Sequence, residues 1–317
     1  DWDYKALQKA ISVAVRFMDN VNDKTLVPLP EQEENLKNKR RIGLGVLGYG
    51  SALMMLKVRY GSPQALRLTE KLSSFIMNEA YRASALLAAE KGAFPLFNKE
   101  KYLAGKFVAR LEPEIRELIE KNGIRNSHLL SIQPTGNSSV LANNVSGGIE
   151  PLFSAEYVRT VVQPSAPAGL SVPKMIDWQN HKILDADGSS GWEWSKEGDE
   201  PMLVTRFQNQ VWKIDRSRGL LKENPVVDYA VRQLKDSDQW DPQAPWATTA
   251  QGLNLDAHIN TLRVFSKYVD SAISKTVNLP NKFTFDKFKK LYWDIYSAGT
   301  IKGCTTYREG TMASVLS

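Results

Sequence analysis

Short apolar segments with the composition of β-strands alternate along this chain with longer amphipathic helical segments. The strand-like segments cover residues 128–133, 275–279 and 304–307. Parallel strands need a long crossover connection, usually a helix, so strands that alternate with helices favour a parallel sheet. The alternation therefore predicts a parallel α/β architecture.

The N-terminal third of the chain has a helical pattern. Apolar residues recur at helical spacing between Leu7 and Met18, in an element that ends before Pro28 and Pro30. Pro63 is well placed in the first turn of a second long pattern, and Asn122-Gly123 is typical of a helix end. Further helices are predicted over residues 45–57, 63–90, 113–121, 257–274 and 285–297.

The composition sets the outer limits of the interpretation. With 317 residues and 42% hydrophobic content, the chain is long enough for one large core or two ordinary ones. The net charge of +6 invites a nucleic-acid interpretation. Acidic and basic residues are mixed along the chain, however, and we interpret the one dense basic cluster, Lys37–Arg41, as a solvated approach to a helix. We therefore expect no direct nucleic-acid partner, and phosphorylated metabolites suit a mildly basic chain better.

Targeting signals are not evident. The sequence has no apolar run of about 18 residues, so we expect no membrane span. It begins Asp-Trp-Asp-Tyr, without an initiator Met or a secretory signal, which fits processing, trimming or a split gene. The single cysteine, Cys304, excludes an internal disulfide and suits a reducing compartment, so a cytoplasmic location is expected.

Residues 163–251 differ in texture from the rest of the chain. Tryptophans stand among Gly, Asp, Gln and Pro, and we predict an insertion or lobe built from loops and short helices. Tryptophans in such a segment can stack on bases, but they more often supply the hydrophobic core of a loop-rich lobe. The tryptophans in question are Trp178, Trp192, Trp194, Trp212, Trp240 and Trp246.

Two glycine-containing motifs are candidate nucleotide-binding sites. Gly43–Gly48 matches the dinucleotide fingerprint G-x-G-x-x-G, but residues 35–41 before it are polar rather than a buried strand, so close helix packing is the favoured role. The second motif follows the strand-like segment 128–133 and opens a helical stretch over residues 140–144. Free N–H groups and hydroxyls at a helix start bind phosphate, although an ordinary N-cap explains the same residues. The candidate phosphate-binding residues are Pro134, Thr135, Gly136, Asn137, Ser138 and Ser139.

The remaining reactive side chains show no catalytic or metal-binding pattern. His128, His181 and His258 lack the spacing of metal ligands, and with one cysteine no zinc site can be assembled, so no metal is expected. Cys304 has no His or acid near it in sequence and is interpreted as a buried, inert thiol.

Five segments, in the same order, resemble motifs of ribonucleotide reductase large subunits. The segment Arg40–Gly48 is similar to the family's RRIGLGVMG element, and Tyr268–Pro280 to its YVDNAISKTINLP. The other three are Gly123–Ser127 with Gln133–Gly136, Asn144–Pro151, and Thr306–Thr311. The candidate phosphate loop departs from the family pattern at Asn137 and Ser138, which are polar, so binding of a diphosphate or triphosphate is still expected.

The resemblance implies that residues 1–317 form the C-terminal half of the ten-stranded α/β barrel of this family. It also implies a helical N-terminal part, the Trp-rich insertion at 163–251, and a partner that is the N-terminal half-barrel. That half carries a finger loop with an Asn-x-Cys-x-Glu motif and the radical cysteine. The chemistry needs one thiyl cysteine and two reducing cysteines, so this chain is expected to hold no catalytic residue and to be inactive alone. A ribonucleotide substrate and a thiol reductant such as thioredoxin are implied.

The class within the family is indicated by residues 301–308. Reductases that import a radical from a metal-containing subunit carry two adjacent tyrosines near this position, and this stretch has only Tyr307. The resemblance therefore implies class II and adenosylcobalamin as the cofactor. The alternatives are a class I fragment, a non-catalytic phosphate-binding remnant of a reductase, and an NAD-binding oxidoreductase that uses Gly43–Gly48.

Overall fold

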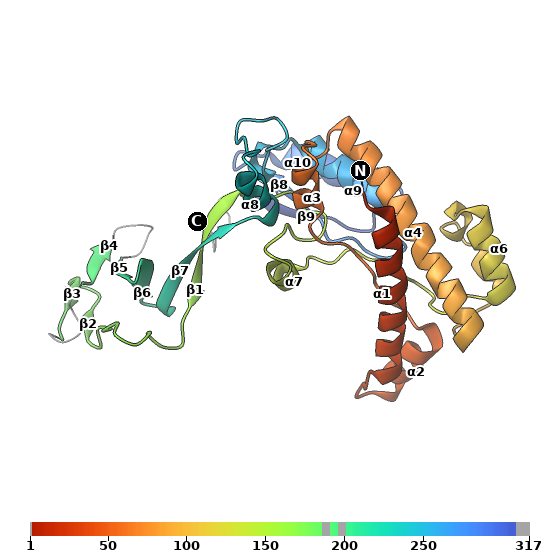
Figure 1. The fold of residues 1–317 in the computed structure, drawn as a ribbon, viewed down its shortest axis with the longest axis horizontal. Coiled ribbons are helices and arrows are strands. Elements are labelled where there is room, and N and C mark those ends of the chain that lie inside the picture. The colour runs from red at the N-terminus through yellow and green to blue at the C-terminus, as the bar shows by residue number, and fades with distance from the viewer. Residues whose placement is uncertain (1, 186–190, 196–200, 309–317) are drawn as a thin grey trace. The chain divides into compact units, whose positions relative to one another are not determined.

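A computed structural model of the chain describes residues 2–185, 191–195 and 201–308 (Figure 1). The described residues form two compact units. We call residues 2–153 with 228–308 the α/β unit, and residues 154–227 the β unit. None of the described helices is both long enough and apolar enough to cross a membrane.

The α/β unit contains most of the helices. Its α-helices are α1 (Tyr4–Lys24), α2 (Pro30–Lys39), α3 (Tyr49–Met55), α4 (Pro63–Lys91), α5 (Lys99–Leu103), α6 (Pro113–Asn122), α7 (Gly136–Leu141), α8 (Tyr229–Asp236), α9 (Leu255–Ser266) and α10 (Phe285–Ser297). Two 3₁₀ turns, η1 (Val108–Arg110) and η2 (Ala250–Gly252), and two strands, β8 (Thr276–Leu279) and β9 (Thr305–Arg308), complete it.

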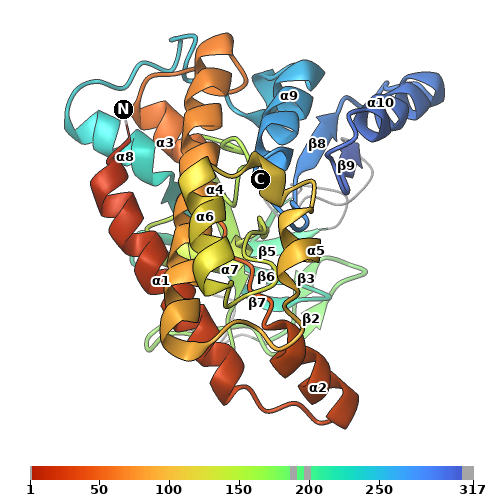
Figure 2. The ribbon, with the colours of Figure 1, turned by 90° about the vertical axis from the view of Figure 1, so that its right-hand side faces the viewer.

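The long helices α1 and α4 pack against each other and supply part of the core (Figure 2). The side chain of Asp3 caps α1 by accepting a hydrogen bond from the Ala6 amide at 3.0 Å. Ser62 caps α4 in the same way, and Pro63 occupies its first turn, where no intrahelical amide donor is needed. The helices predicted at both places are confirmed, because capping and apolar spacing are signals that lie within the helix itself.

Two predicted helices are wrong over part of their length. The one predicted at 45–57 begins only at Tyr49, and the one predicted at 257–274 ends at Ser266. Residues 45–48 instead continue the extended backbone of Leu44, which pairs with residues 129–131, and residues 271–274 pair with residues 130–132. The Ser131 amide donates to the Leu44 carbonyl at 3.0 Å, and the Ser274 amide donates to the Ile132 carbonyl at 2.8 Å. Pairing with a distant segment thus overrides the helical pattern.

Four extended segments of the α/β unit follow one another in space in the order in which they occur in sequence. They are residues 42–44, 129–132, 271–279 and 305–308. The parallel partners are Leu44 with Leu130, Ile132 with Ile273, and Thr276 with Thr305. Helices lie between these segments in sequence, as parallel neighbours require. The predicted α/β fold class is confirmed, and sequential parallel order is what one part of an α/β barrel has.

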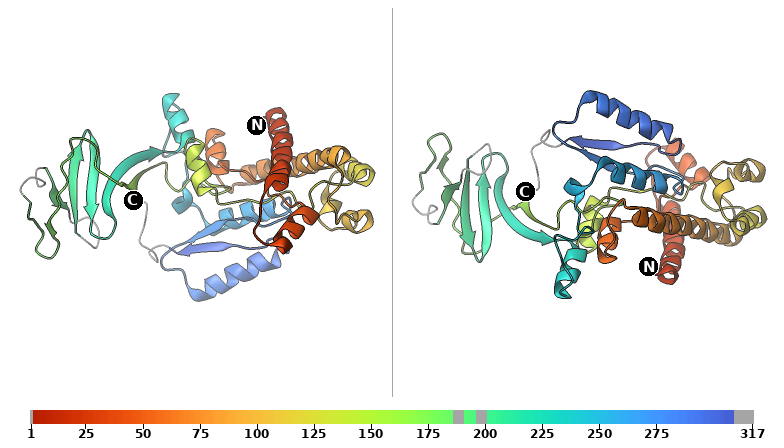
Figure 3. Two further views of the ribbon diagram at one scale, coloured as in Figure 1. Left: turned by 90° about the horizontal axis from the view of Figure 1, so that it is seen from below. Right: turned by 90° about the horizontal axis from the view of Figure 1, so that it is seen from above.

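The C-terminal helix α10 covers the last parallel pair. Figure 3 shows α10 alongside β8 and β9, and its buried residues Leu291 and Ile295 pack against Val277 and Leu279 of β8. Cys304 is half-buried at the edge of this cluster.

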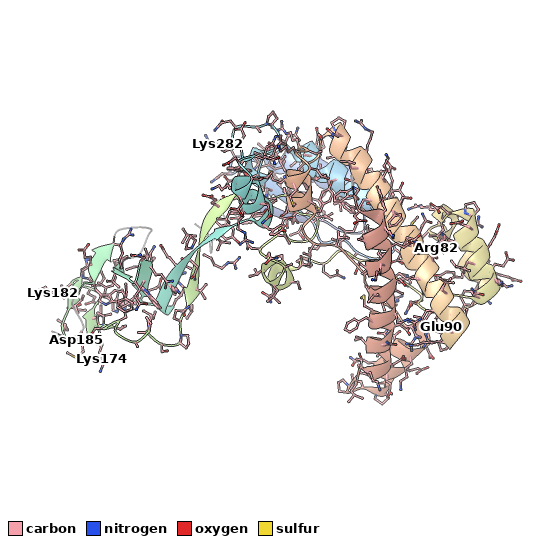
Figure 4. All side chains as sticks on the ribbon, viewed as in Figure 1. Arg82, Glu90, Lys174, Lys182, Asp185 and Lys282 are labelled. Carbon is pink, nitrogen blue, oxygen red and sulfur yellow. The ribbon has the colours of Figure 1, made fainter. Side chains whose placement is uncertain are left out.

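The β unit is an antiparallel sheet with strand order β1-β7-β6-β5-β4, together with the short hairpin β2-β3. Its strands are β1 (Glu156–Val162), β2 (Ile176–Asp177), β3 (Lys182–Ile183), β4 (Glu193–Ser195), β5 (Met202–Phe207), β6 (Gln210–Asp215) and β7 (Gly219–Val227). Near β2 and β3, Asp185 accepts hydrogen bonds from the amides of Lys174 and Met175 at 2.7 and 3.2 Å (Figure 4).

The prediction of loops and short helices for residues 163–251 is wrong where the structure has strands β2 to β7, whereas residues 163–175 are loop as predicted. A tight turn at Gln208 and Asn209, both with positive φ, joins β5 to β6, and it lacks the glycine that usually signals such a hairpin. Trp192 and Trp212 are buried with Leu203 in the core of the sheet, as the hydrophobic interpretation predicts. Trp240 and Trp246 belong to the α/β unit. That residues 163–251 are an insertion relative to other proteins stays a prediction.

Candidate functional site

The six candidate phosphate residues lie directly after the extended segment 129–132. Helix α7 begins at Gly136, four residues before the helical stretch predicted from the sequence, so that Gly136, Asn137 and Ser138 form its first turn. The first N–H groups of a helix have no intrahelical partner, and these three residues are exposed. The polar residues of the motif therefore present backbone donors as well as side chains at the surface.

Gly136 and Ser139 have different roles in this turn. A Cβ built at Gly136 would meet no atom within 4 Å, so the fold itself does not require a glycine there. Ser139 is buried, and its hydroxyl donates to the Gly136 carbonyl at 3.3 Å. Ser139 thus stabilises the turn on its buried side, whereas Gly136 leaves the exposed side of the turn free of any side chain.

Thr135 fixes where the turn begins. Its φ of +56° is unusual for a β-branched residue, and its Oγ1 accepts a hydrogen bond from the Gly148 amide at 2.8 Å. A Cβ at Gly147 would lie 2.7 Å from the Pro134 carbonyl oxygen, and one at Gly148 would lie 2.7 Å from the Gln133 carbonyl oxygen. The glycine pair of the segment 144–151 is needed because backbone packs on backbone here.

The glycines of the G-x-G-x-x-G motif also serve close backbone approach, but between extended segments rather than between helices as predicted. A Cβ at Gly45 would lie 2.3 Å from the Ser131 carbonyl oxygen, and one at Gly43 the same distance from the Ser131 hydroxyl. A dinucleotide phosphate cannot occupy space that another strand fills. The NAD-binding alternative is therefore wrong at this motif.

Lys275, which was assigned no role from the sequence, is a buried lysine that binds Glu150 of the segment 144–151. Lys275 is fully buried, and its Nζ donates to the Glu150 carboxylate at 2.6 Å and to the Thr276 carbonyl, with His258 Nδ1 at 3.0 Å. Burial and then the charge of Lys275 lower the pKa of His258 to about 3, so its imidazole is neutral. Burial lowers the pKa of Lys275, which the Glu150 carboxylate opposes.

The basic cluster that was interpreted as solvated contains a buried ion pair, which corrects that interpretation. Arg40 binds the fully buried Asp19 carboxylate at 2.7 Å, and Arg125 approaches the same carboxylate at 3.2 Å. Burial raises the pKa of Asp19, but the hydrogen bonds and charges of the two arginines outweigh it and hold the pKa below its usual value. Asn126 also donates to Asp19 at 3.1 Å, so two of the five sequence segments meet at one carboxylate.

The reactive side chains form no metal centre. Among the described residues no group of three or more His, Cys, Asp or Glu side chains is arranged to hold an ion. Cys304 is half-buried rather than buried as predicted, and burial raises the pKa of its thiol. Residues 309–311 of the last sequence segment lie outside the described residues.

Two cavities are lined by residues outside the candidate loop. One of about 580 Å³ on the β unit is lined by both charged and apolar side chains, including Glu193, Arg206 and Lys213. Another of about 370 Å³ lies beside α1 and is largely apolar. None of the six candidate phosphate residues lines either one, so cavity size does not identify the site.

Comparison with known families identifies the family to which the chain belongs. The profile of the family "Ribonucleotide reductase, barrel domain" matches residues 1–307, and the chain belongs to this family. It is 29% identical over 316 residues, 98% of this chain, to the vitamin B12-dependent ribonucleoside-diphosphate reductase of Mycobacterium tuberculosis CDC 1551. The corresponding enzyme of Thermoplasma acidophilum is 27% identical over 97% of this chain. The ribonucleoside-diphosphate reductase subunit alpha of Chlamydia pneumoniae is 29% identical over half of it.

The chain spans 37% of the length of the Mycobacterium relative and 33% of the Thermoplasma relative. The resemblance to class II reductases noted in the sequence is confirmed by these full-length matches of the chain to vitamin B12-dependent enzymes. The loop was predicted from the sequence, but the roles of Asp19, Glu150 and Lys275 were not. No local pattern marks these three residues as ion-pair partners, because the residues that they bind lie far away in sequence.

Proposed function

We propose that this chain is the C-terminal half of a ribonucleotide reductase barrel and binds the phosphates of the ribonucleotide substrate. The observation that carries the proposal is the exposed first turn of α7 at the carboxyl end of a parallel segment. Ligands of parallel α/β folds bind at that end of the strands. The relatives' names specify a ribonucleoside diphosphate, so we propose a diphosphate as the group bound.

The chemistry of the loop fits an anionic ligand. The amides of Gly136, Asn137 and Ser138 and the hydroxyl of Ser138 can donate hydrogen bonds to phosphate oxygens, and no side-chain carboxylate lies in the motif. The loop lacks a lysine or arginine, so binding by this chain relies on backbone donors. Such donors orient a diphosphate without the flexibility of a long cationic side chain.

The reduction itself requires groups that this chain does not contain. Removal of the ribose 2′-hydroxyl as water takes two electrons, which two thiols supply by forming a disulfide, while a third cysteine acts as the thiyl radical. The chain has one cysteine, Cys304, so we propose that an N-terminal half with the Asn-x-Cys-x-Glu finger loop supplies the reacting thiols, and that a thiol reductant such as thioredoxin restores them. The isolated chain is proposed to be inactive.

Adenosylcobalamin is proposed as the cofactor of the assembled enzyme, where it would supply the radical. The stretch 301–308, near which a radical-importing reductase carries two adjacent tyrosines, contains a single tyrosine, Tyr307. These residues fit a radical made locally. We assign no described residue a contact with the corrin ring of the cofactor. The proposed contribution of this chain to the reaction is to hold the substrate. A cytoplasmic location is proposed with this function.

The phosphate site is tested by titrating the chain with ADP in a calorimeter. Gly136→Val places a branched side chain over the first turn, in space that is open in the fold, and should abolish detectable binding while leaving the melting temperature unchanged. Ser138→Ala removes one hydrogen bond and should weaken binding by about 0.5–1.5 kcal/mol. If both variants bind ADP as the unaltered chain does, the site is wrong.

The split catalytic function is tested by assaying ribonucleotide reduction with the chain alone and with an N-terminal half-barrel, each with and without adenosylcobalamin. Activity is expected only from the pair with the cofactor. Turnover by the chain alone would refute the need for a partner. Activity of the pair with a metal-containing radical subunit instead of cobalamin would favour class I, and ADP binding without any activity would favour the non-catalytic remnant.

A further inference from the structure

The segment 146–150 is held by side chains from distant elements at both of its ends, and its centre holds the candidate phosphate loop. This arrangement deepens the proposed function and rests on it. We call the contacts of Ser146 and of Glu150 the two anchors of this segment, and neither residue is part of the loop.

At the first end, Ser146 and Ser51 bind each other twice. The Ser146 amide donates to the Ser51 hydroxyl oxygen at 2.8 Å, and the Ser51 amide donates to the Ser146 hydroxyl oxygen at 3.2 Å. The Ser51 hydroxyl donates in turn to the buried carboxylate of Asp228 at 2.7 Å. This end is thereby tied to α3 and to the start of α8.

At the second end, both carboxylate oxygens of Glu150 are bound. Oε2 accepts from Lys275 Nζ at 2.6 Å, and Oε1 accepts from the Thr276 amide at 2.6 Å. The neutral imidazole of His258 accepts at Nδ1, so all three N–H groups of the ammonium have acceptors. The carboxylate thus fixes the position of the segment along β8.

A buried ion pair is weak support for stability, because a pair of apolar residues of the same size stabilises a fold equally well or better. What the charged pair adds is direction: two hydrogen bonds to one carboxylate hold the backbone of residue 150 in one place. The Gly148 amide, two residues before it, donates to Thr135 at 2.8 Å and holds that residue at a φ of +56°. This hydrogen bond therefore connects the position of residue 150 to the residue at which α7 begins.

We propose that Glu150 and Lys275 are positioning residues for the phosphate loop and act through Gly148 and Thr135. They touch no substrate in this proposal. Their effect is to keep the amides of the first turn of α7 aimed at the diphosphate before it binds.

The test is the double variant Glu150→Gln, Lys275→Met. Because both charges are removed together, neither side chain is left as an unpaired charge. ADP and inorganic pyrophosphate are the probes, and affinity is measured by calorimetry on the full chain. We expect both dissociation constants to rise about tenfold, equivalent to about 1.4 kcal/mol. The Gly148 amide should exchange its hydrogen faster, with a melting temperature close to that of the unaltered chain.

A matched control is the pair Lys213–Glu223 of the β unit, whose charged atoms lie 2.5 Å apart. The variant Lys213→Met, Glu223→Gln should leave the affinity for both probes unchanged. Thr135→Val, which removes the acceptor hydroxyl, should weaken binding by itself, and adding the Glu150 and Lys275 changes to it should weaken binding no further.

The outcomes separate this inference from the function on which it rests. If Gly136→Val binds ADP like the unaltered chain, the phosphate site itself is wrong. If Gly136→Val loses binding while the Glu150 and Lys275 variant keeps it, the site stands and the positioning role is overturned. A rise in the dissociation constants that only accompanies a large fall in melting temperature, or that adds fully to Thr135→Val, also overturns it.

Discussion

The two units of this chain are held together by contacts of different range. In the α/β unit, polar side chains connect segments far apart in sequence: Arg125 reaches Asp19 across 106 residues, and Lys275 reaches Glu150 across 125. In the β unit, each described strand except β1 pairs with a neighbour in sequence, either in the five-stranded antiparallel sheet or in the separate hairpin β2-β3, and a small tryptophan-rich core packs against the sheet. The first unit depends on specific distant partners, whereas the second depends mainly on adjacent hairpins.

The family profile matches residues of both units, whereas the short motifs noted in the sequence lie in the unit with the long-range contacts. The described residues of all five segments that resemble ribonucleotide reductases belong to the α/β unit. Asp19 binds Arg40, Arg125 and Asn126 at once, so a change at this one position removes a contact with each of these residues. A hairpin needs only an alternating pattern and a turn, which many sequences satisfy.

The largest expected effect is the loss of Asp19. Asp19→Ala removes the buried carboxylate that binds Arg40 and Arg125, and should destabilise the α/β unit by about 3–5 kcal/mol. The free energy of unfolding is measured in urea with a signal that reports on the α/β unit. Asp23→Ala is the control, because Asp23 binds the same arginine at 2.7 Å but its side chain is 40% exposed. An equal cost for the two variants would contradict the importance of the buried contact.

The corresponding change in the β unit is Leu203→Ala. Leu203 is fully buried beside Trp192 and Trp212, and its truncation should cost about 2–5 kcal/mol through the cavity it leaves. Calorimetry should show a lower melting temperature for the β unit alone, with ADP affinity unchanged. A shift of the α/β transition by the same amount would show that the two units do not unfold separately.

Acid should affect the two units at different pH values. The pKa of His258 is about 3 in the folded chain, against 6.5 for an ordinary histidine, so the unfolded chain binds a proton first as the pH falls. The free energy of unfolding of the α/β unit should therefore fall below pH 6.5, by at most about 1.4 kcal/mol per pH unit for this one proton, until the pH reaches about 3.

In the β unit the hydrogen bonds of Arg218 and Ser217 outweigh burial and lower the pKa of Asp215. Its stabilising effect should be lost only as the pH falls below the ordinary value of 3.8. His258→Gln is the control, since it should remove the slope of the α/β unit between pH 6.5 and 4 and leave the β unit unaffected. Parallel slopes in the two units would argue against His258 as the cause.

The smallest effect is expected from an exposed ion pair of the α/β unit. Arg16 and Glu90 approach to 2.6 Å, but their side chains are 49% and 55% exposed (Figure 4 labels Glu90). Water and salt screen such a pair, so Arg16→Ala should leave the urea midpoint unchanged. A loss comparable to that of Asp19→Ala would mean that burial does not distinguish the long-range contacts of this unit.

The sequence alone predicted those features whose signals are local. Pro63 with its Ser62 cap marked the start of α4, Gly123 marked the end of α6, and the polar run after Ile132 marked the candidate loop. Family motifs, read as short strings, gave the fold class. Each of these signals acts over a few residues, because capping, turn formation and helical spacing are properties of neighbouring groups.

Only the tertiary structure decided which helical patterns become extended and which charges become buried. Residues 42–44 and 271–274 are extended because each gains hydrogen bonds to residues 129–132, a gain that no local pattern records. Lys275 is indistinguishable in sequence from a surface lysine, and its role depends on a carboxylate 125 residues away. The physical reason is that a buried polar group must find its partner somewhere in the fold. The position of that partner is determined only when the distant segments have packed together.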